Sequence, residues 1–366
     1  MDFDYSSEQE ALRDSVRRFV EREYDWERRF SLLRSPAGVD PAHWATFAEL
    51  GWLGAGLSEE DGGFGGGATE NALIAEELGR GLVTEPFIAH VVATQILAAV
   101  ESDAVAGLVM GETRIVPALQ EANGRGDWKV IESEASESGT LSGTKTLVEG
   151  AAFADRFILS ARSPKGVGLY LVDAQVPGVT LKPYRTVDNR RVADIDFHDT
   201  PALELAVGAV AEAAIDHGMD HGIVALCGEA LGIMDAALWA TRDYLKVRKQ
   251  FGTAIGNFQA LQHRMADMLI ETEMVRSLLY RAQGAIASSD PAARAAAISA
   301  AKAAVSTAGP YVGGQAIQLH GGIGVTEELN ISHYYRRLFV IARQFGDADL
   351  HMDRFAAAVD RNAIPA

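Results

Sequence analysis

The pattern of hydrophobic and polar positions changes twice along the chain, near residue 112 and again near residue 204. Before the first change the pattern is helical. Leu12, Val16 and Phe19 recur at helical spacing, and Ser7 followed by Glu10 predicts a capping box for that helix. Two more helices are predicted over residues 41–50 and 69–79.

Between the two changes the pattern is that of short strands. Five β-rich runs cover residues 128–132, 155–161, 167–173, 179–184 and 193–198, and Gly, Pro, Asn or Asp separates them. Because no amphipathic helix intervenes, these runs predict an antiparallel sheet and not a series of βαβ units. The lack of a strand–GxGxxG–helix passage also argues against a Rossmann fold.

After residue 204 the pattern is helical to the end. Long helices are predicted over residues 210–247 and 259–288, and Asp290–Pro291 predicts the start of an alanine-rich helix. Gly309–Pro310 is expected to end or kink that helix, and a final helix follows Gly346. The predicted class is α+β, with an N-terminal α-helical domain (1–111), a middle β-sheet domain (112–204) and a C-terminal four-helix-bundle domain (205–366).

Composition narrows the functional classes. The 366 residues include 33 Lys plus Arg against 50 Asp plus Glu, and the net charge of −17 argues against nucleic acid or anionic membrane as a partner. The lone cysteine, Cys227, excludes an intrachain disulfide and is expected to be a buried, inert thiol. No stretch has the composition expected of a membrane span, and the acidic start does not resemble a signal peptide, so a cytoplasmic protein is expected.

A glycine-rich run, SEEDGGFGGG at residues 58–67, is not a phosphate loop because it lacks the Lys-Ser/Thr ending and follows no strand. A flexible turn is the favoured interpretation, and a loop near a binding cleft remains the alternative.

Two later passages carry candidate chemistry. VRKQFGTAIGNFQALQHRMADM (247–268) predicts a helix ending near Arg248, a turn at Gly252 and a new helix. The guanidinium of Arg248 suits a diphosphate and Phe251 offers a flat apolar face, although a plain surface turn would explain both. QAIQLHGGIGVTEE (315–328) combines polar side chains with glycines that let backbone approach a ligand closely.

Together the two passages resemble the C-terminal domain of the acyl-CoA dehydrogenase family. ELGWLGAGLSEEDGGFG and LSGTKTLVEGAAFADRFILSAR are similar to the family's N-terminal and β-domain passages, so the likeness covers the whole chain. Within the family, the ending RLFVIARQFGDADLH is most like the small subunit of pimeloyl-CoA dehydrogenase and related heteromeric enzymes.

The resemblance implies a tetramer with FAD at each subunit boundary, contacted partly from a neighbouring subunit. It assigns cofactor contacts here to Arg248, Phe251, Gln259, Gln318, Leu319, His320, Gly321 and Gly322. No metal is implied.

The family's catalytic machinery is not matched. The usual glutamate base precedes Gly-Thr, but that place is held by Phe345, and the alternative helical position is held by Gly222. The titratable residues near these two positions, which are the alternative candidates for a base, are Asp220, His221, Asp347 and Asp349.

Two family passages on the β domain are also altered. Residues 120–127 read QEANGRGD in place of the family's Thr-Glu-Pro-x-x-x-Ser-Asp. Leu147, Val148 and Glu149 replace Trp-Ile-Thr, which removes an aromatic face and a hydroxyl donor and adds a carboxylate.

The resulting hypothesis is a base-deficient subunit of an FAD-dependent acyl-CoA dehydrogenase heterotetramer. The assembly would oxidise an acyl-CoA from fatty acid or steroid degradation to the 2-enoyl-CoA and reduce an electron-transfer flavoprotein. Two alternatives stay open: a self-sufficient homotetramer with an unconventional base, and a flavin-free structural paralogue.

Overall fold

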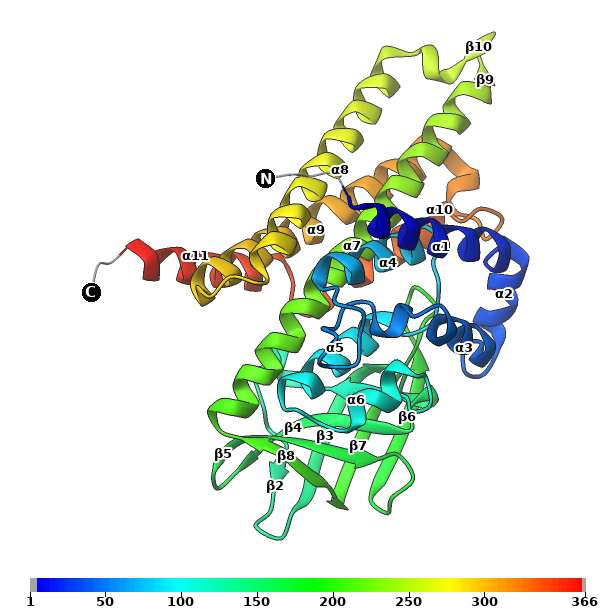
Figure 1. Cartoon of the computed structure of the whole chain (residues 1–366). Helices are drawn as coiled ribbons and strands as arrows, with labels where there is room; N and C mark the ends of the chain where they lie inside the picture. The colour runs from blue at the N-terminus through cyan, green and yellow to red at the C-terminus, as the bar shows by residue number, and fades with distance from the viewer. Residues whose placement is uncertain (1–4, 364–366) are drawn as a thin grey trace. The chain divides into compact units, whose positions relative to one another are not determined.

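The computed structural model (Figure 1) describes residues 5–363, with side chains up to residue 360. The chain divides into two compact units. Unit 1 comprises the described residues up to Arg29, Ala72–Val83 and the chain from Val224 onward, and unit 2 comprises Phe30–Asn71 and Thr84–Ile223. Helix α7 (Ala209–Val247) begins in unit 2 and ends in unit 1.

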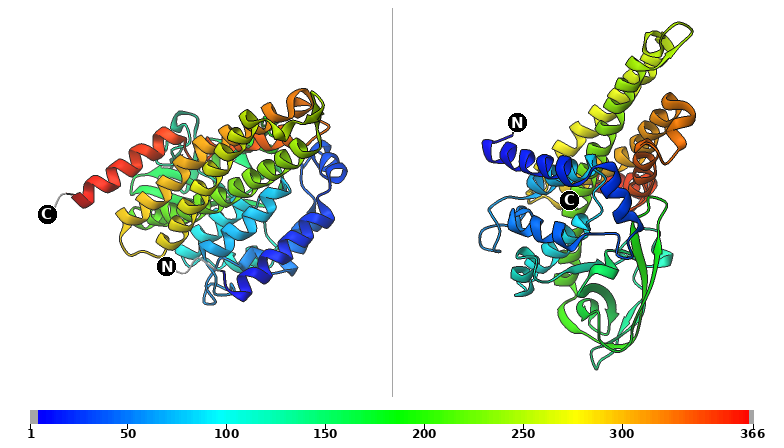
Figure 2. Two further views of the ribbon diagram at one scale, coloured as in Figure 1. Left: turned by 90° about the horizontal axis from the view of Figure 1, so that it is seen from above. Right: turned by 90° about the vertical axis from the view of Figure 1, so that its right-hand side faces the viewer.

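Unit 1 is helical. Its elements are α1 (Ser7–Glu23), most of α4 (Ala68–Arg80), the second half of α7, α8 (Gln259–Ala285), α9 (Pro291–His320), α10 (Ile331–Ile341) and α11 (Ala348–Ala363). Strands β9 (Lys249–Gln250) and β10 (Thr253–Ala254) form a hairpin between α7 and α8, which run side by side to that hairpin (Figures 1 and 2).

Unit 2 combines short helices with a sheet. Its helices are α3 (Pro41–Glu49), α5 (Phe87–Ala99) and α6 (Ala104–Val109), and α2 (Trp26–Arg34) crosses into it. Its strands are β1 (Ile115–Ala118), β2 (Glu134–Ala135), β3 (Thr140–Glu149), β4 (Arg156–Ser163), β5 (Gly166–Asp173), β6 (Val179–Arg185), β7 (Arg191–Pro201) and β8 (Leu203–Val207). The core beneath the sheet includes Leu141, Phe157 and Ile195.

Most strand pairs of the sheet are antiparallel, as predicted, but two pairs are parallel, so the sheet is mixed. The strand order is β6-β7-β3-β2-β4-β5-β8, and β1 and β2 both pair with β4 in the parallel direction. The run at 128–132 is not a strand either. Trp128 is buried there, and its indole Nε1 donates a hydrogen bond of 3.1 Å to Asp216 at the start of α7.

Several predicted helix boundaries are confirmed, and the position of the first capping box is wrong. Asp290 caps α9 by accepting hydrogen bonds from Ala292 and Ala293, and α11 follows Gly346 as predicted. The first capping box uses Ser6 and Gln9, one residue earlier than predicted, because Ser6 has the extended backbone of an N-cap. Of the two outcomes expected at Gly309–Pro310, an end or a kink, the helix end does not occur: α9 continues to His320, and its extensive burial against other helices offsets the lost hydrogen bond.

One helix in the described part of the chain, α7, has the length and apolar composition of a membrane span. Most of its apolar window, 83%, is buried inside the fold, which is typical of a core helix. Cys227 lies on α7 and is fully buried, and burial raises the pKa of its thiol to about 12, so the inert thiol expected from the sequence is confirmed.

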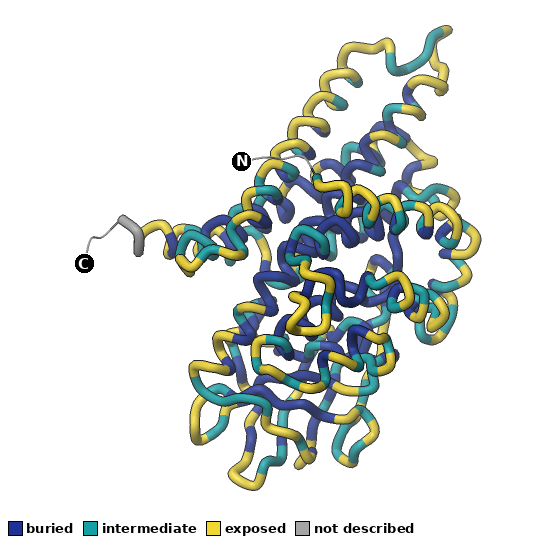
Figure 3. The backbone as a smooth tube through the Cα atoms, viewed as in Figure 1, coloured by how far each residue is buried: buried dark blue, intermediate teal, exposed yellow. Residues whose placement is uncertain are grey.

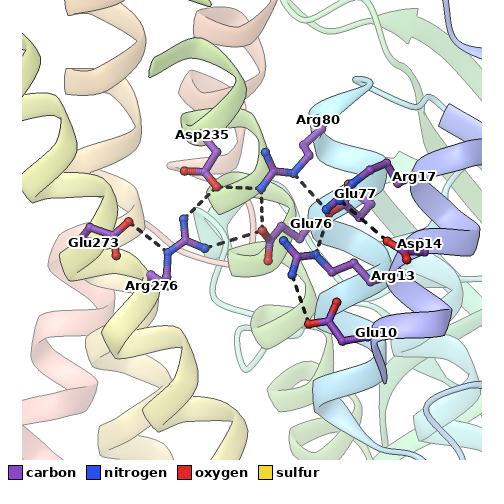
Figure 4. A network of polar contacts seen from close by, with 10 residues as sticks. All are labelled: Glu10, Arg13, Asp14, Arg17, Glu76, Glu77, Arg80, Asp235, Glu273 and Arg276. Carbon is purple, nitrogen blue, oxygen red and sulfur yellow. Dashed lines mark hydrogen bonds and ion pairs between the residues drawn. The ribbon is translucent and has the colours of Figure 1, made fainter. Parts of the chain in front are cut away.

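Helices α4 and α7 cross with their backbones in contact inside unit 1. Glycines make this approach possible: a Cβ added at Gly79 or Gly232 would overlap a backbone carbonyl oxygen of the other helix. Around the crossing, Arg80 of α4 and Arg276 of α8 both bind the carboxylate of Asp235 on α7, at 2.7 and 2.8 Å (Figure 4). The crossing thereby fixes how these three helices pack.

We expect Gly232→Ala to lower the free energy of unfolding by about 2–3 kcal/mol, because the new methyl group would overlap the carbonyl oxygen of Glu76. Urea unfolding measures the change. Gly314→Ala on α9 is the matched control, since a Cβ there meets only the Tyr335 ring at 3.9 Å. Equal stability of the two variants would contradict the close crossing.

Candidate functional site

The turn between α7 and α8, called the hairpin tip and comprising residues 247–259, has a defined backbone. The carbonyl of Arg248 accepts a hydrogen bond of 2.8 Å from Ile255 N–H, and Gln250 pairs with Thr253 across the hairpin. Phe251 and Gly252 between them have φ values of 52° and 80°. A two-residue hairpin turn of this kind needs both positive φ values, which Gly252 adopts readily and Phe251 only at a cost.

Three side chains of the hairpin tip that the sequence singled out point outward. Phe251 is 93% exposed, and Arg248 and Gln259 are exposed as well. No hydrogen bond or ion pair from another described residue reaches the guanidinium of Arg248 or the amide of Gln259. A guanidinium with all its donors available is a ready partner for a phosphate or carboxylate.

The second predicted passage lies at the end of α9 and in the short helix η5 (Gly321–Val325). Gln318, Gly321 and Gly322 are exposed, and a Cβ at either glycine would meet no described atom within 4 Å. Gly321 has φ 69°, so the turn itself explains this glycine. Nothing in the described chain requires glycine at residue 322, and the bare backbone there leaves room for a ligand.

Leu319 and His320 lie inside unit 1 instead. The imidazole of His320 stacks on Tyr244 at 4.4 Å between ring centroids, and its Nδ1 lies 2.8 Å from the carbonyl oxygen of Ala316. Burial lowers the pKa of His320 below its ordinary value. Tyr244 also donates a hydrogen bond of 3.3 Å to the carbonyl of His320 and so links α7, four residues before Arg248, to the start of η5.

The turn at Phe345, which the resemblance equates with the base, is held by two buried side chains. Phe345 and Gly346 have φ values of 60° and 100°. Lys302 donates a hydrogen bond of 2.7 Å to the carbonyl of Gly346, and the Nε2 of His351 lies 2.9 Å from the carbonyl of Phe345. The turn therefore keeps a fixed backbone but presents a phenyl group, which cannot accept a proton.

The other candidates for a base are dispersed. Gly222, Asp220 and His221 are buried on α7 in unit 2. Asp347 and Asp349 lie at the exposed start of α11 in unit 1, where Asp347 accepts a hydrogen bond of 3.0 Å from Leu350 N–H as a helix cap.

The polar groups of the altered passage at residues 147–149 have partners within the chain. Leu147 sits at a β-bulge with φ 55°, and its N–H donates to Asp194 at 3.2 Å. The same carboxylate accepts a hydrogen bond of 2.7 Å from the hydroxyl of Tyr184. Burial, together with this bond, raises the pKa of Tyr184 to about 12. Glu149 is paired with Arg190 at 2.5 Å, so the added carboxylate is neutralised by a cation from its own chain.

The other altered passage contains a buried ion pair. The carboxylate of Glu121 forms an ion pair with the fully buried ammonium group of Lys145, at a distance of 2.5 Å. It also accepts hydrogen bonds from the backbone N–H and the hydroxyl of Ser133. Burial lowers the pKa of Lys145, against the attraction of Glu121. This glutamate therefore secures the loop at 120–127 and does not face outward.

Sequence reasoning missed the supporting residues of the Phe345 turn. Lys302 lies in an alanine-rich helix 44 residues before Gly346, and His351 follows in the next helix. The one available signal was a lone lysine inside an otherwise apolar stretch, which indicates a buried amine with a polar partner.

Comparison with known proteins shows the family. Residues 6–105 match the description "Acyl-CoA dehydrogenase, N-terminal domain" and residues 212–359 match "Acyl-CoA dehydrogenase, C-terminal domain". The chain belongs to the acyl-CoA dehydrogenase family, whose enzymes are oxidoreductases acting on CH–CH groups.

Particular relatives include heteromeric enzymes. Acyl-CoA dehydrogenase IpdE2 of Mycolicibacterium smegmatis is 29% identical over 97% of this chain and 99% of its own. The solved structure of a Tcur3481–Tcur3483 steroid ACAD variant has a TM-score of 0.90 with 31% identity, covering 97% of this chain and 98% of that one. The ChsE4–ChsE5 complex from Mycobacterium tuberculosis matches in fold, with a TM-score of 0.90, 24% identity and full coverage of both chains (100%).

We expect Lys302→Met to remove a pH dependence of stability. In the fold, burial lowers the pKa of Lys302 from 10.5 to about 8. Between these values the unfolded chain binds more protons at this site than the folded chain, so stability falls as pH decreases through that window, by roughly 3 kcal/mol. Urea unfolding at the two ends of the window measures this change.

Lys165→Met is the matched control, because the Lys165 side chain is 69% exposed. It should keep the wild-type dependence on pH. The assignment fails if the Lys302 variant loses as much stability as the wild type between the same two pH values.

Proposed function

We propose that this chain is the base-deficient subunit of a heteromeric acyl-CoA dehydrogenase and that it completes an FAD site in a catalytic partner subunit. The observation that carries the proposal is a contrast between two sets of residues: one set has polar side chains open to solvent, and the other has its polar groups paired within the chain. Arg248, Gln259 and Gln318 have unpaired polar groups that face outward, whereas the altered positions 147 and 149 are satisfied within the chain.

The outward residues fit the cofactor from a neighbouring subunit. Arg248 supplies a forked cation for the diphosphate, and Gly321–Gly322 supply backbone that a ligand can approach closely. Phe251 offers an aromatic face at the end of the hairpin tip. All these groups lie on unit 1.

The same chain fits a flavin of its own poorly. The N–H of Leu147 is already donated to Asp194, and a Glu149–Arg190 ion pair stands where the family has a hydroxyl donor. At the base position, Phe345 offers no proton acceptor. These three features together support a base and flavin pocket supplied by another subunit.

FAD, when bound, would accept hydride from the β-carbon of the acyl-CoA, and the partner's base would remove the α-proton to give the 2-enoyl-CoA. This chain's residues bind and orient the cofactor. The proposed assembly is a heterotetramer that passes its electrons to an electron-transfer flavoprotein. Because relatives include a steroid ACAD, a steroid-derived acyl-CoA is the first substrate to assay.

We expect Arg248→Ala to release FAD from the assembled complex, with occupancy falling at least about tenfold, because a charge-assisted contact to diphosphate is lost. The visible flavin absorbance of the purified complex, relative to its protein concentration, gives the occupancy. Arg162→Ala, at an exposed arginine of unit 2, is the matched control and should leave occupancy unchanged.

The outcome separates the competing hypotheses. Yellow, active protein from this chain alone would contradict the proposal and favour a self-sufficient homotetramer. A complex that keeps full FAD occupancy after Arg248→Ala would favour a flavin-free structural paralogue that only stabilises its partner.

Phe345→Glu alone is not expected to make this chain an active enzyme. The variant restores a carboxylate at the family's base position, but Leu147 and Glu149 still occupy the positions of the missing stacking face and hydroxyl. The test is acyl-CoA oxidation by the purified variant with added FAD and a dye acceptor. Turnover well above that of the wild-type chain would show that the base was the single defect.

A further inference from the structure

The proposed cofactor contacts come from two separate segments of unit 1. Arg248 lies in the hairpin tip at the end of α7, and Gly321–Gly322 begin η5 at the end of α9. One ligand can bind both segments only when their spacing matches that ligand. A spacing that is fixed before binding also lowers the entropic cost of binding. The contacts that set this spacing therefore affect affinity even though they do not touch the ligand.

The hairpin tip is held against the last turn of α7. A Cβ added at Gly256 would lie 3.0 Å from the carbonyl oxygen of Leu245, so the returning chain passes directly over the backbone of α7. The amide of Gln262 on α8 donates a hydrogen bond of 2.9 Å to the carbonyl of Gly256. Together with the bond from Ile255 N–H to the carbonyl of Arg248, these contacts make the hairpin tip and the end of α7 a single segment.

The short helix η5 is held in a similar way against the last turn of α9. A Cβ added at Gly324 would lie 2.8 Å from the carbonyl oxygen of Ile317 and 2.9 Å from the Cβ of His320. Gly321 caps α9 by donating its N–H to the carbonyls of Gln318 and Ile317. The position of η5 is therefore set by the last turn of α9, to which the buried side chain of His320 belongs.

Tyr244 connects these two segments. Its ring stacks on the imidazole of His320, with the centroids 4.4 Å apart and the ring planes at 23°, and its hydroxyl donates a hydrogen bond of 3.3 Å to the carbonyl of His320. Tyr244 lies about one helical turn before Arg248, and His320 immediately precedes Gly321. The stacked pair thus joins the two ligand-facing segments next to the residues that would contact the ligand.

The two stacked rings are occupied within unit 1. His320 is 6% exposed, and its Nδ1 lies 2.8 Å from the carbonyl oxygen of Ala316 in the same helix. Tyr244 is half-buried and uses its hydroxyl on the backbone of η5. These partners fix the orientation of both rings before any ligand binds.

We propose that Tyr244 and His320 are positioning residues that hold Arg248 and the backbone of Gly321–Gly322 at the spacing that one FAD molecule requires. The inference rests on the proposed function for the identity of the ligand. It gives His320 an indirect role, exerted through η5, and it gives Tyr244 a role that the family resemblance does not assign.

The test measures the Kd of FAD for the assembled complex, after the cofactor has been removed and titrated back. We expect Tyr244→Leu to raise this Kd at least about tenfold, because the two segments are no longer held at one spacing. Tyr244→Phe keeps the stacked ring and loses only a long hydrogen bond, so its Kd should stay within about threefold of the wild-type value.

Tyr280→Leu is the matched control. Tyr280 is also a half-buried tyrosine of unit 1 that packs on another ring, that of Tyr5 at 6.1 Å, but it lies near the other end of α8 from the hairpin tip. Its replacement should leave the Kd of FAD unchanged. The proposal is overturned if Tyr244→Leu binds FAD as the wild type does, or if Tyr280→Leu weakens binding equally.

A double variant distinguishes positioning from general loosening of the fold. Without the guanidinium of Arg248 the spacing to η5 matters less, so Tyr244→Leu should raise the Kd by less than about threefold in an Arg248→Ala background. A side chain that only stabilised the helices would raise the Kd by the same factor in both backgrounds. Equal factors would therefore contradict a positioning role.

Hydrogen exchange of the full chain separates this inference from the proposed function. If Arg248→Ala leaves the Kd of FAD unchanged, the proposed function has failed, and the connection between the two segments is then measured without a ligand. We expect the amides of residues 321–325 to exchange at least about tenfold faster in Tyr244→Leu than in the wild type, because η5 has lost its support, and at the wild-type rate in Tyr280→Leu. Unchanged exchange in Tyr244→Leu overturns the inference whatever the fate of the proposed function.

Discussion

The helical unit depends on a buried set of shared charges. Glu76 and Glu77 of α4 face Arg80 on the same helix, Arg276 of α8 and two arginines of α1, so each carboxylate meets more than one guanidinium (Figure 4). Burial raises the pKa of Glu76 even against these cations, which shows how much desolvation the set must offset. Removing any one member would leave the remaining buried charges with fewer partners, so the set favours one packing of α1, α4, α7 and α8. That packing positions the start of the α7–α8 pair, whose far end carries Arg248.

The features predictable from sequence were those with local causes. Asp290 and Pro291 start α9 through contacts within one turn, and Gly252 permits the hairpin turn by its own backbone freedom. The parallel pairing of β1 and β2 with β4 was missed because it depends on distant segments, and α5 was missed because it is buried on nearly every side and shows no amphipathic period. The residues of the candidate site also fall into a group that could be predicted from the sequence and a group that could not. The resemblance pointed to Arg248, Gln318 and Phe345, whereas the internal partners of Leu147, Glu149 and Gly346 could be seen only in three dimensions.

The molecule has buried cations that are paired within the chain and exposed polar side chains that are not. The lysines at 145 and 302 and the arginine at 190 find carboxylate, hydroxyl or carbonyl partners within the chain. Arg248, Gln259 and Gln318 do not, although ordinary surface rotations would let each find water. The altered positions 147 and 149 have partners within the chain, whereas these three side chains stay open to solvent.

The exposed hairpin tip has a consequence for how the chain is produced. Phe251 stands 93% exposed, and the adjoining part of α8 presents Leu269, Ile270 and Met274 on a largely uncovered helix (Figure 3). Such surface attracts other apolar surfaces without selectivity, so a chain in which it stays uncovered would aggregate or be degraded. Under the proposed heteromeric function, balanced synthesis of the two chains would then matter as much to the yield of enzyme as the stability of either fold.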